Sequence, residues 1–230
     1  IKGAMCIGEP LRNQDFSLNT LSQKINDKWN IKLFSTYAST EMSTAFTECE
    51  YGMGGHHHPE LIIVEVLDEF NKQVKNGESG ELTFTSLGIQ AMPLIRFKTG
   101  DVIKAHYESC SCGRNTMRVG PVIGRKQQMI KYKGTTLYPP AMNDILNGFE
   151  NIQTHIIEIH NNDIGTDEIV IKLAVKQQSD EFLSEIKDHF RAKLRVTPKI
   201  EFTTKEILNT MILNPMSRKP IHFFDLRKEK

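Results

Sequence analysis

Several features that define special classes of protein are scarce or missing in this sequence. No apolar run approaches the about 20 residues that a membrane-spanning helix needs. The first residues, IKGAMCIGEP, lack both the basic and the apolar region of a signal peptide. Basic residues are not in excess, because 29 Lys and Arg stand against 28 Asp and Glu, a formal net charge of +1. We therefore expect a cytoplasmic protein that binds neither nucleic acid nor a membrane.

Cysteine is also scarce, with four residues in 230. Nothing in the sequence indicates secretion, so free thiols or a metal site are favoured over a disulfide framework. The chain has no initiator methionine and begins within a predicted strand, so we expect a piece of a longer polypeptide. Its composition, 39% hydrophobic and 25% charged, is typical of a globular protein.

The first part of the chain combines strand patterns with one helical pattern. Strands are predicted for residues 1–7 and for KLFSTY, ELIIVEVLD, GELTFTSL and PLIRFKTGDVIKAHY. The two runs ELIIVEVLD and GELTFTSL are joined by the turn-prone KNGESG, which predicts a hairpin. The last run is expected to be interrupted by a turn at residues 99–101. Leu21, Ile25 and Trp29 at four-residue spacing predict a helix with one buried stripe, capped by Asn19 or Thr20.

The pattern changes after Gly124, which predicts a second domain. GRKQQMIKYKGTTLYPP is typical of a hinge and a hairpin, and the proline pair at its end can open a short helix. THIIEIHNN and DEIVIKLAV predict strands, and DEFLSEIKDHFRAKL predicts an amphipathic helix. KIEFTTKEIL and PIHFFDLR are expected to complete the sheet. We therefore predict a mixed α+β fold, with a larger domain in residues 1–123 and a smaller α+β domain in residues 124–230.

Two short stretches suit a nucleotide, although each alone is also typical of an ordinary turn. YASTE, residues 37–41, places hydroxyls and turn N–H groups before a glutamate, a set that suits phosphate oxygens and Mg²⁺. FKTGD, residues 97–101, places a carboxylate after a glycine turn, where it can accept both hydroxyls of a ribose.

The ordered set GEP, YASTE, FKTGD, GRKQQMIKYKG and a late Ser-x-Lys resembles the adenylate-forming acyl-CoA ligases. It is most similar to the phenylacetate–coenzyme A ligase branch, for which IGEP, Glu-Cys before Gly-x-His, GELTFTSLGIQAMPLIRFKTGD and CSCGR are typical. The resemblance covers the whole chain. It implies the C-terminal part of the large nucleotide-binding domain of such an enzyme, followed by a small mobile lid domain.

The resemblance also implies a reaction and its small-molecule partners. An aryl or arylacetic acid, such as phenylacetate, would be activated by ATP and Mg²⁺ to an acyl-adenylate and then transferred to coenzyme A, with release of AMP. A homodimer is compatible with it. Two alternatives stay open: a related adenylyltransferase of the deazaflavin-cofactor synthetase type, and a nucleotide- and zinc-binding module without activity. The phosphate loop of the family has no counterpart here, so we expect the 230 residues alone to be inactive.

The resemblance assigns roles to individual residues. The expected nucleotide-binding residues are Gly8, Glu9, Pro10, Tyr37, Ala38, Ser39, Thr40, Asp101 and Arg125. Among them, the GEP turn would line the adenine pocket, Asp101 would bind the ribose and Arg125 would face the nucleotide. Thr40, Glu41 as the Mg²⁺ ligand, and Lys219 at the α-phosphate are the expected catalytic residues.

Three positions depart from the family pattern. Gln127 stands where a carboxylate is usual, and Arg218 and Ala38 stand where the family has glycine. The first two departures bear on how the lid moves and on the role assigned to Lys219.

In the stretch TECEYGMGGHHHPE a cysteine and three histidines lie close together at an internal position, which by itself is compatible with a metal site and with a polar loop that collects histidines. With the later CSC, the set Cys49, His56, Cys110 and Cys112 has the composition of a tetrahedral structural Zn²⁺ site. From spacing alone, reduced thiols and a solvated histidine loop are an equal alternative. The resemblance favours zinc, because it aligns His56 with the Gly-x-His position. Cys6 is expected to pack as a small hydrophobe.

Overall fold

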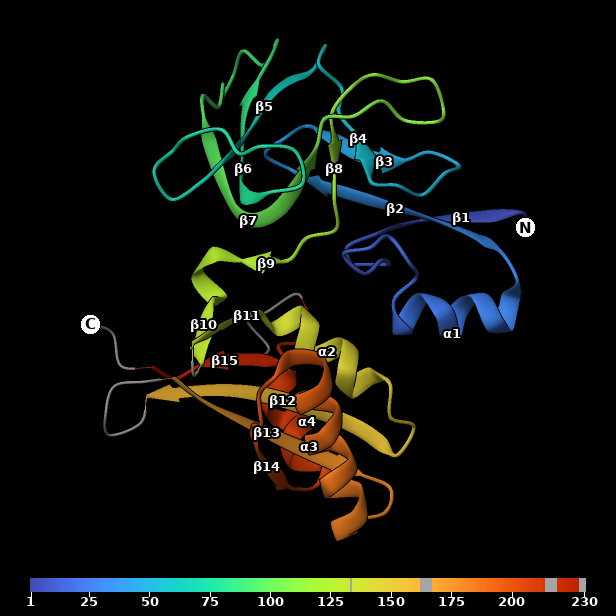
Figure 1. The fold of residues 1–230 in the computed structure, drawn as a ribbon, viewed down its shortest axis with the longest axis vertical. Helices are drawn as coiled ribbons and strands as arrows, with labels where there is room; N and C mark the ends of the chain where they lie inside the picture. The colour runs from blue at the N-terminus through green and yellow to red at the C-terminus, as the bar shows by residue number, and fades with distance from the viewer. Residues whose placement is uncertain (133, 162–166, 214–218, 228–230) are drawn as a thin grey trace. The chain divides into compact units, whose positions relative to one another are not determined.

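The structure, a computed structural model, describes residues 1–132, 134–161, 167–213 and 219–227. The chain forms two compact units, unit 1 (Ile1–Gln127) and unit 2 (Gln128–Lys230), both drawn in Figure 1. A 3-10 turn, Lys126–Gln128, spans the boundary. Each unit mixes helices with a sheet, so the predicted mixed α+β class is confirmed. No helix in the described ranges is long and apolar enough to cross a membrane.

Unit 1 is built on one large sheet. Its elements are β1 (Gly3–Ile7), α1 (Thr20–Trp29), β2 (Lys32–Ser39), β3 (Thr44–Glu48), β4 (Gly55–His56), β5 (Ile62–Leu67), β6 (Ser79–Ser86), β7 (Phe97–His106), β8 (Arg118–Val119) and β9 (Gly124–Arg125). The strand order is β1-β2-β3-β4-β8-β7-β6-β5, with β9 paired to β7. Only the β1–β2 pair is parallel, and α1 connects these two strands.

Helix α1 begins where the sequence predicts it, but its buried stripe is smaller than expected. The Asn19 side chain caps the helix by accepting a hydrogen bond from the Ser22 N–H at 3.0 Å. Of the predicted stripe, Ile25 packs on the buried cluster of Leu11, Ile31 and Leu33. Leu21 and Trp29 are instead 39% and 68% exposed. The prediction of one buried stripe is therefore wrong, because of these three residues only Ile25 packs against the cluster formed by the first two strands and their flanking loop.

The second half of the unit 1 sheet is antiparallel. β5 and β6 form the predicted hairpin, with Ile62 opposite Ser86 and Leu67 opposite Glu81. β7 continues through residues 99–101, so the expected interruption is wrong. The pairing register shifts opposite this point, between Glu81 and Thr83, and Gly100 has a φ of 77°. A bulge absorbs the turn without ending the strand.

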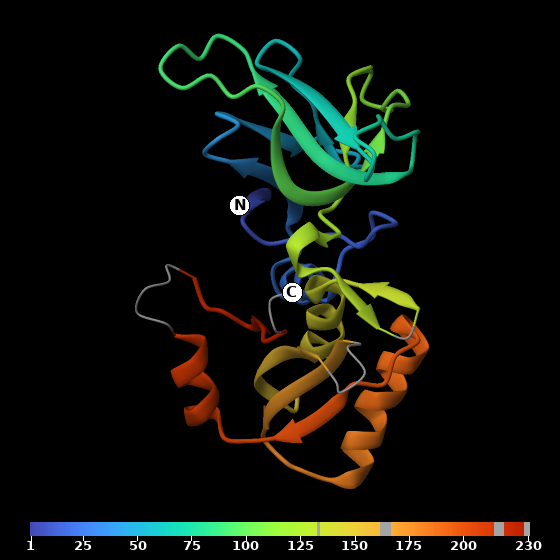
Figure 2. The ribbon, with the colours of Figure 1, turned by 90° about the vertical axis from the view of Figure 1, so that its left-hand side faces the viewer.

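Unit 2 is a smaller α+β unit. Its elements are β10 (Ile130–Tyr132), β11 (Thr135–Leu137), α2 (Pro139–Asn147), β12 (Ile152–Asn161), β13 (Asp167–Val175), α3 (Asp180–Leu194), β14 (Lys199–Phe202), α4 (Lys205–Ile212) and β15 (Phe223–Asp225). β10 and β11 form a hairpin, and the other strands form a sheet in the order β14-β13-β12-β15. Figure 2 shows α3 and α4 on opposite sides of this sheet.

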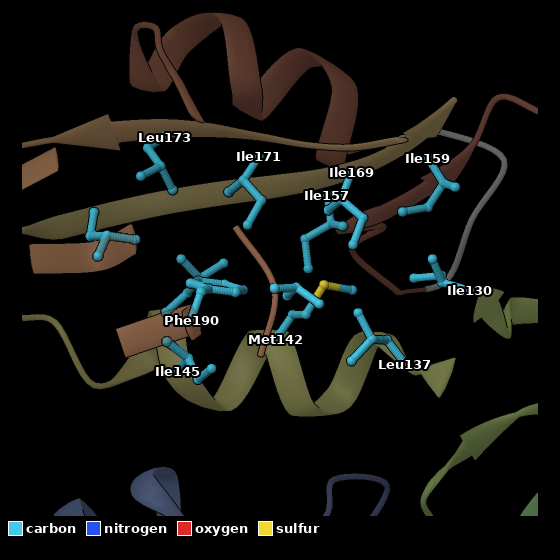
Figure 3. Close-up of a cluster of buried hydrophobic side chains, with 13 residues drawn as sticks. Ile130, Leu137, Met142, Ile145, Ile157, Ile159, Ile169, Ile171, Leu173 and Phe190 are labelled. Carbon is cyan, nitrogen blue, oxygen red and sulfur yellow. The ribbon is translucent and has the colours of Figure 1, made fainter. Parts of the chain in front are cut away.

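A continuous apolar core holds unit 2 together. Ile157 and Ile159 of β12 and Ile171 of β13 face Met142 of α2 and Phe190 of α3, and all five are fully buried (Figure 3). Alternation along β12 turns its next residues to the other face, where a smaller cluster forms against α4. The sheet is therefore covered by apolar contacts on both faces.

One predicted strand in unit 2 is shorter than expected. The sequence KIEFTTKEIL forms β14 only as far as Phe202, and Lys205 begins α4. The hydroxyl of Thr204 accepts a hydrogen bond from the Ile207 N–H at 3.3 Å, which caps this helix. Threonine is a favoured N-cap residue, and no glycine or proline follows Thr204 within α4. This capping pattern overrides the strand propensity of Ile207.

Candidate functional site

The two expected nucleotide motifs at the start of the chain emerge at the same edge of the unit 1 sheet. GEP (residues 8–10) follows β1, and YASTE (residues 37–41) ends β2. These strands are parallel neighbours, with Ile7 opposite Thr36. Gly8, Glu9 and Pro10 are all exposed, as is Thr40. Ligands of open α/β sheets bind outside the carboxyl ends of parallel strands, so this edge is suited to a small molecule.

A hydrogen bond joins the YASTE and FKTGD motifs although they are distant in sequence. The Tyr37 hydroxyl donates to Oδ2 of Asp101 at 2.7 Å. The Tyr37 ring stacks on Phe46, with ring centroids 6.0 Å apart. Burial, and then the negative charge of Asp101, raise the pKa of Tyr37 far above its ordinary value. Tyr37 therefore remains a neutral donor that orients the carboxylate.

Arg125 approaches the other oxygen of the same carboxylate. Its Nε lies 3.5 Å from Oδ1 of Asp101, and the two residues are opposite each other in the β7–β9 pair. The Thr99 hydroxyl accepts the Asp101 N–H at 3.1 Å, which fixes the backbone of the bulge. The Arg125 side chain is 69% exposed, against 18% for Asp101. The carboxylate is thus held from two sides, with one cation open to solvent beside it.

The turn after β2 carries the remaining candidates of unit 1. The Met42 N–H donates to the Ser39 hydroxyl at 3.4 Å, which closes the turn, and Ala38 lies within the β2–β3 pair opposite Ala45. Glu41 is exposed. Its own backbone N–H and the Ser39 hydroxyl lower the pKa of Glu41. Glu41 is therefore an accessible, ionised carboxylate, as a Mg²⁺ ligand has to be.

Lys219, the expected adenylation lysine, belongs to unit 2. It is exposed and lies shortly before β15. Arg218, the departure beside it, lies outside the described residues. Gln127, the departure at the predicted hinge, is the last residue of unit 1.

The structure brings the four predicted metal ligands together in unit 1. The ligand atoms of Cys49, His56, Cys110 and Cys112 all lie within 4.8 Å of one another. The sulfur atoms of Cys49 and Cys110 are 3.7 Å apart, and the Cys112 sulfur is 3.5 Å from His56 Nε2. In the described part of the chain each of the four cysteines is a free thiol.

These separations fit a tetrahedral ion. With bonds of about 2.3 Å to sulfur and about 2.0 Å to nitrogen, a tetrahedral Zn²⁺ places two sulfurs about 3.8 Å apart and a sulfur and a nitrogen about 3.5 Å apart. The hydroxyl of Thr116 lies 3.5 Å from Nδ1 of His56, the ring nitrogen that faces away from the thiols. A histidine that binds a metal usually donates its other N–H in this way. Chemistry and geometry both suit a closed Cys₃His site.

The surroundings of the cluster favour the thiolate form of one of its cysteines, Cys112. A backbone hydrogen bond from Arg114 is the main reason why the pKa of Cys112 falls to about 7. Nη1 of Arg114 also donates to the Cys112 sulfur at 3.5 Å. Burial instead raises the pKa of the Cys49 thiol and lowers that of His56, so the histidine is neutral and ready to bind a metal.

The neighbouring candidates have other contacts. His57 Nε2 lies 2.8 Å from the Ile62 carbonyl, and His58 Nδ1 lies 3.0 Å from a carboxylate oxygen of Glu60. Cys6 packs against the small apolar cluster beneath α1. The sequence interpretation missed Arg114, Thr116 and Arg118 around the thiols. No local pattern signals them, because strand pairing and the loop between Cys112 and β8 create their contacts.

Comparisons with known proteins agree with this architecture, although no protein-family model matches the chain. The phenylacetate-coenzyme A ligase of Thermus thermophilus is 29% identical over 170 residues, which is 72% of this chain and 38% of that protein. The phenylacetate-coenzyme A ligase of Escherichia coli is 27% identical over 124 residues, 54% of this chain and 27% of that protein. The chain thus spans well under two thirds of these relatives.

The fold is also similar to solved CoA ligases. The 2-hydroxyisobutyryl-CoA ligase in its postadenylation state matches with a TM-score of 0.77 at 23% identity, covering 97% of this chain and 48% of that one. An anthranilate CoA ligase in complex with anthranoyl-AMP matches with a TM-score of 0.61 at 17% identity, covering 82% and 39%. The predicted kinship is therefore confirmed: the chain is a relative of the phenylacetate–coenzyme A ligases and has the fold of adenylate-forming CoA ligases.

Proposed function

We propose that this chain supplies the ribose-binding and lid parts of an ATP-dependent, AMP-forming ligase that makes the coenzyme A thioester of an aryl or arylacetic acid. In the first step, a carboxylate oxygen attacks the α-phosphorus of ATP and pyrophosphate leaves. In the second, the coenzyme A thiolate attacks the acyl carbonyl carbon and AMP leaves. The substrate class follows the curated relatives, which act on phenylacetate.

The contact among Tyr37, Asp101 and Arg125 is the observation that carries this proposal. Adjacent ribose hydroxyls are recognised by a carboxylate that accepts from both of them. Asp101 is held for this task by the Tyr37 hydroxyl at 2.7 Å, with the Arg125 guanidinium at 3.5 Å. A carboxylate already oriented loses less entropy when it binds a ligand. The exposed Arg125 would face the nucleotide beside this carboxylate.

The remaining roles follow the chemistry of the exposed side chains. Mg²⁺, when bound by Glu41, would neutralise phosphate charge during adenylation. The hydroxyls of Ser39 and Thr40 would donate to phosphate oxygens, and GEP would border the adenine. Lys219 would stabilise the charge that accumulates on the α-phosphate in the transition state.

Nucleotide binding tests the ribose role. We expect Asp101→Asn to weaken AMP binding about 10- to 100-fold, the scale of one or two hydrogen bonds to a charged group. Asp27→Asn on α1 is the matched control, because that carboxylate accepts from Gln23 on an exposed helix face. Isothermal titration calorimetry of the longest native polypeptide containing this sequence measures both. Equal affinities for the two variants would remove Asp101 from the site.

The two half-reactions test Lys219. We expect Lys219→Ala to lower pyrophosphate release about 10²-fold or more, the scale for one lost transition-state contact. Thiolysis of a supplied acyl-adenylate should be largely kept. Loss in both steps or in neither would reassign the role, and Arg218 would be tested next. Free coenzyme A consumed in step with AMP formation distinguishes a ligase from an adenylyltransferase.

We also propose that Cys49, His56, Cys110 and Cys112 bind one structural Zn²⁺. Four protein ligands leave no open position, so the ion takes no part in the reaction. Metal analysis of the purified native protein should find about one Zn²⁺ per chain. We would abandon this proposal if removing metal with a chelator left amide hydrogen exchange around these four residues unchanged.

A nucleotide- and zinc-binding role without turnover is the second candidate. It is favoured by one observation: the chain covers 38% and 27% of the two curated relatives. We expect residues 1–230 alone to show neither half-reaction. AMP binding without pyrophosphate release, even in the longest native polypeptide, would favour this second role.

A further inference from the structure

The middle of the unit 1 sheet is formed by two very short strands. β4 and β8 contain two residues each, and they join β3 on one side to β7 on the other. β3 pairs with β4 at two positions, and β4 pairs with β8 at two more. Gly55 within β4 leaves no room for a side chain, because a Cβ there would lie 2.5 Å from the Phe46 carbonyl oxygen. We call β4 and β8 the seam of the sheet.

The predicted metal ligands lie around this seam. His56 belongs to β4, and Cys49 follows β3 directly. Cys110 and Cys112 lie in the connection from β7 to β8. A metal bound here would therefore join the β1–β3 half of the sheet to the β5–β7 half. Tyr37 and Asp101 lie on these two halves, so the seam also joins the two parts of the nucleotide site.

One side chain, Arg118 of β8, reaches both loops that carry the ligands. Its Nη1 donates to the carbonyl of Met53, which lies between Cys49 and His56. Its Nη2 donates to Glu108, to the backbone carbonyl at 3.3 Å and to Oε1 at 2.7 Å. Glu108 is two residues before Cys110. A single guanidinium thus links the two loops, and Arg118 is also the β-sheet partner of His56.

A buried arginine at this position is unfavourable in free energy if its only role is to fill space. Its side chain is 4% exposed, while its partner carboxylate on Glu108 is 49% exposed. Among the described residues its Nε has no hydrogen-bond partner. Burial of a charge that is incompletely paired costs free energy. A Zn²⁺ with three thiolates carries a net charge of −1, so a buried cation beside it is compensated when the site is filled.

We propose that Arg118 positions the two loops that carry the ligands of the metal centre. Metal binding and the pairing of β4 with β8 in the seam thereby stabilise each other. This inference rests on the proposed zinc site. It adds a function for a residue outside the ligand set: the guanidinium prepares the thiols for the ion, and the bound ion balances the guanidinium. Outer partners of metal ligands typically change affinity 10- to 100-fold when they are mutated.

Zinc affinity of the native protein is the main test, measured by competition with a chromophoric chelator. We expect Arg118→Gln to weaken Zn²⁺ binding about 10- to 100-fold. Arg118→Lys keeps the charge but not the planar fork, so we expect partial recovery. Arg96→Gln is the matched control: it breaks the Arg96–Glu65 ion pair in the same sheet, away from the thiols. It should bind Zn²⁺ like the wild-type protein.

A role in folding alone predicts different results. In that case Arg118→Gln would lower the melting temperature equally with and without metal and would leave Zn²⁺ affinity unchanged, which would overturn the proposal. We expect the loss to be larger in the metal-loaded protein. The absorption bands of Co²⁺ bound to thiolates should also shift in Arg118→Gln, because the ligand loops are repositioned.

Three further outcomes of these measurements have different consequences for the proposal. If Arg118→Gln does not fold, Glu108→Gln replaces it, since this variant keeps an acceptor oxygen but removes the half-exposed negative charge that pairs with Arg118, and it should weaken Zn²⁺ binding toward the lower end of the same range. Unchanged affinity in Glu108→Gln would then overturn the proposal. If the wild-type protein takes up no Zn²⁺, the zinc site itself is wrong and this inference falls with it. If zinc binds but both variants bind it normally, only the inference falls.

Discussion

The interior of unit 1 and the interior of unit 2 are stabilised by different kinds of contact. Unit 2 has a continuous apolar core over one face of its sheet, in which twelve buried side chains from four strands and two helices of the described residues meet Val196, which follows α3. Unit 1 has a wider sheet, two separate apolar clusters and a seam of two-residue strands between its halves. One of these clusters crosses the seam, because Phe46 of β3 and Val119 of β8 pack with residues of β5, β6 and β7. Beside it lie polar groups: thiols, a histidine and the buried Arg118. Unit 1 therefore combines apolar burial with charge and, where the proposed ion binds, with coordination, whereas the core of unit 2 is apolar.

Loss of the proposed Zn²⁺ should give the largest effect, and it should be confined to unit 1. Cys112→Ser removes one of four ligands, and structural zinc in small domains contributes about 10 kcal/mol or more of folding free energy. We expect the variant to lose Zn²⁺ and to exchange amide hydrogens faster in β4 and β8. Hydrogen exchange with mass spectrometry measures this, with β12 and β13 as internal references.

Cys6→Ser is the matched control for this prediction. Its thiol is half-buried in β1, outside the cluster. It should keep its metal and its exchange pattern at the seam. Faster exchange in both units after Cys112→Ser would break the comparison, because the metal would then stabilise the whole chain.

A core truncation should have the opposite distribution. Phe190 is fully buried in unit 2. Phe190→Ala should lower the unfolding free energy of unit 2 by about 3–5 kcal/mol, through lost apolar burial and the cavity left behind. Zinc affinity should stay at the wild-type value. Denaturant titration followed by hydrogen exchange of β13 measures the loss, and a parallel loss of zinc would contradict the separation of the two units.

Acid should weaken unit 2 through one buried histidine. His155 of β12 is 7% exposed and its Nε2 lies 2.9 Å from the side-chain oxygen of Asn143. Burial, and then the nearby His222, lower the pKa of His155 to about 4, from 6.5. Between about pH 6.5 and about pH 4, His155 is protonated in the unfolded chain but stays neutral in the native state. The unfolding free energy of unit 2 should therefore fall across this window, by roughly 3 kcal/mol.

His155→Gln should remove most of this pH dependence, because glutamine does not titrate. His189→Gln is the control, since that histidine is exposed on α3. Urea unfolding at about pH 7 and about pH 5 compares the three proteins. If unit 2 of the wild-type protein is equally stable at both pH values, His155 does not cause the predicted loss of stability in acid.

The sequence predicts most of the fold because strong periodic patterns form most of it. β12, β13 and α3 lie where alternation and helical spacing predict them, since their side chains fill one core. The errors occur where tertiary context decides. The exposure of Trp29 depends on which turns of α1 pack against the sheet, and the bulge at Gly100 depends on pairing with β6.

The candidate sites divide in a similar way. The grouping of Cys49, His56, Cys110 and Cys112 was predicted by their residue types together with the family resemblance, since their spacing alone left a metal site and free thiols as equal alternatives, and the structure brings the four together. The sequence predicted the motifs that contain Tyr37 and Asp101 separately. It did not predict the hydrogen bond between these two residues. The role of Arg118 was invisible in the sequence, because it follows from a register in which Arg118 lies opposite His56.

The smallest predicted effects compare two helix caps of the same kind, one in each unit. Asn19 caps α1 by accepting from the Ser22 N–H, and its own side-chain amide donates to the Pro10 carbonyl at 2.6 Å. Ser179 caps α3 by accepting from the Phe182 N–H at 3.1 Å. Ser179→Ala should cost about 1 kcal/mol, the usual value for a lost cap. Asn19→Ala should cost more, about 2 kcal/mol, because it also leaves the Pro10 carbonyl without this donor.

Asn19→Asp separates the two contributions, because a carboxylate keeps the cap acceptor and loses the donor to Pro10. We expect its cost to lie between those of the wild-type protein and Asn19→Ala. Pro10 ends the GEP turn, so Asn19→Asp should also weaken AMP binding a few-fold if that turn borders the adenine, whereas Ser179→Ala should not. Thermal unfolding and AMP titration of the three variants provide the measurements. Equal costs for Asn19→Ala and Ser179→Ala would mean that the GEP turn is held by its own backbone and not by α1, and unit 1 would then resemble unit 2 more closely than its polar contacts indicate.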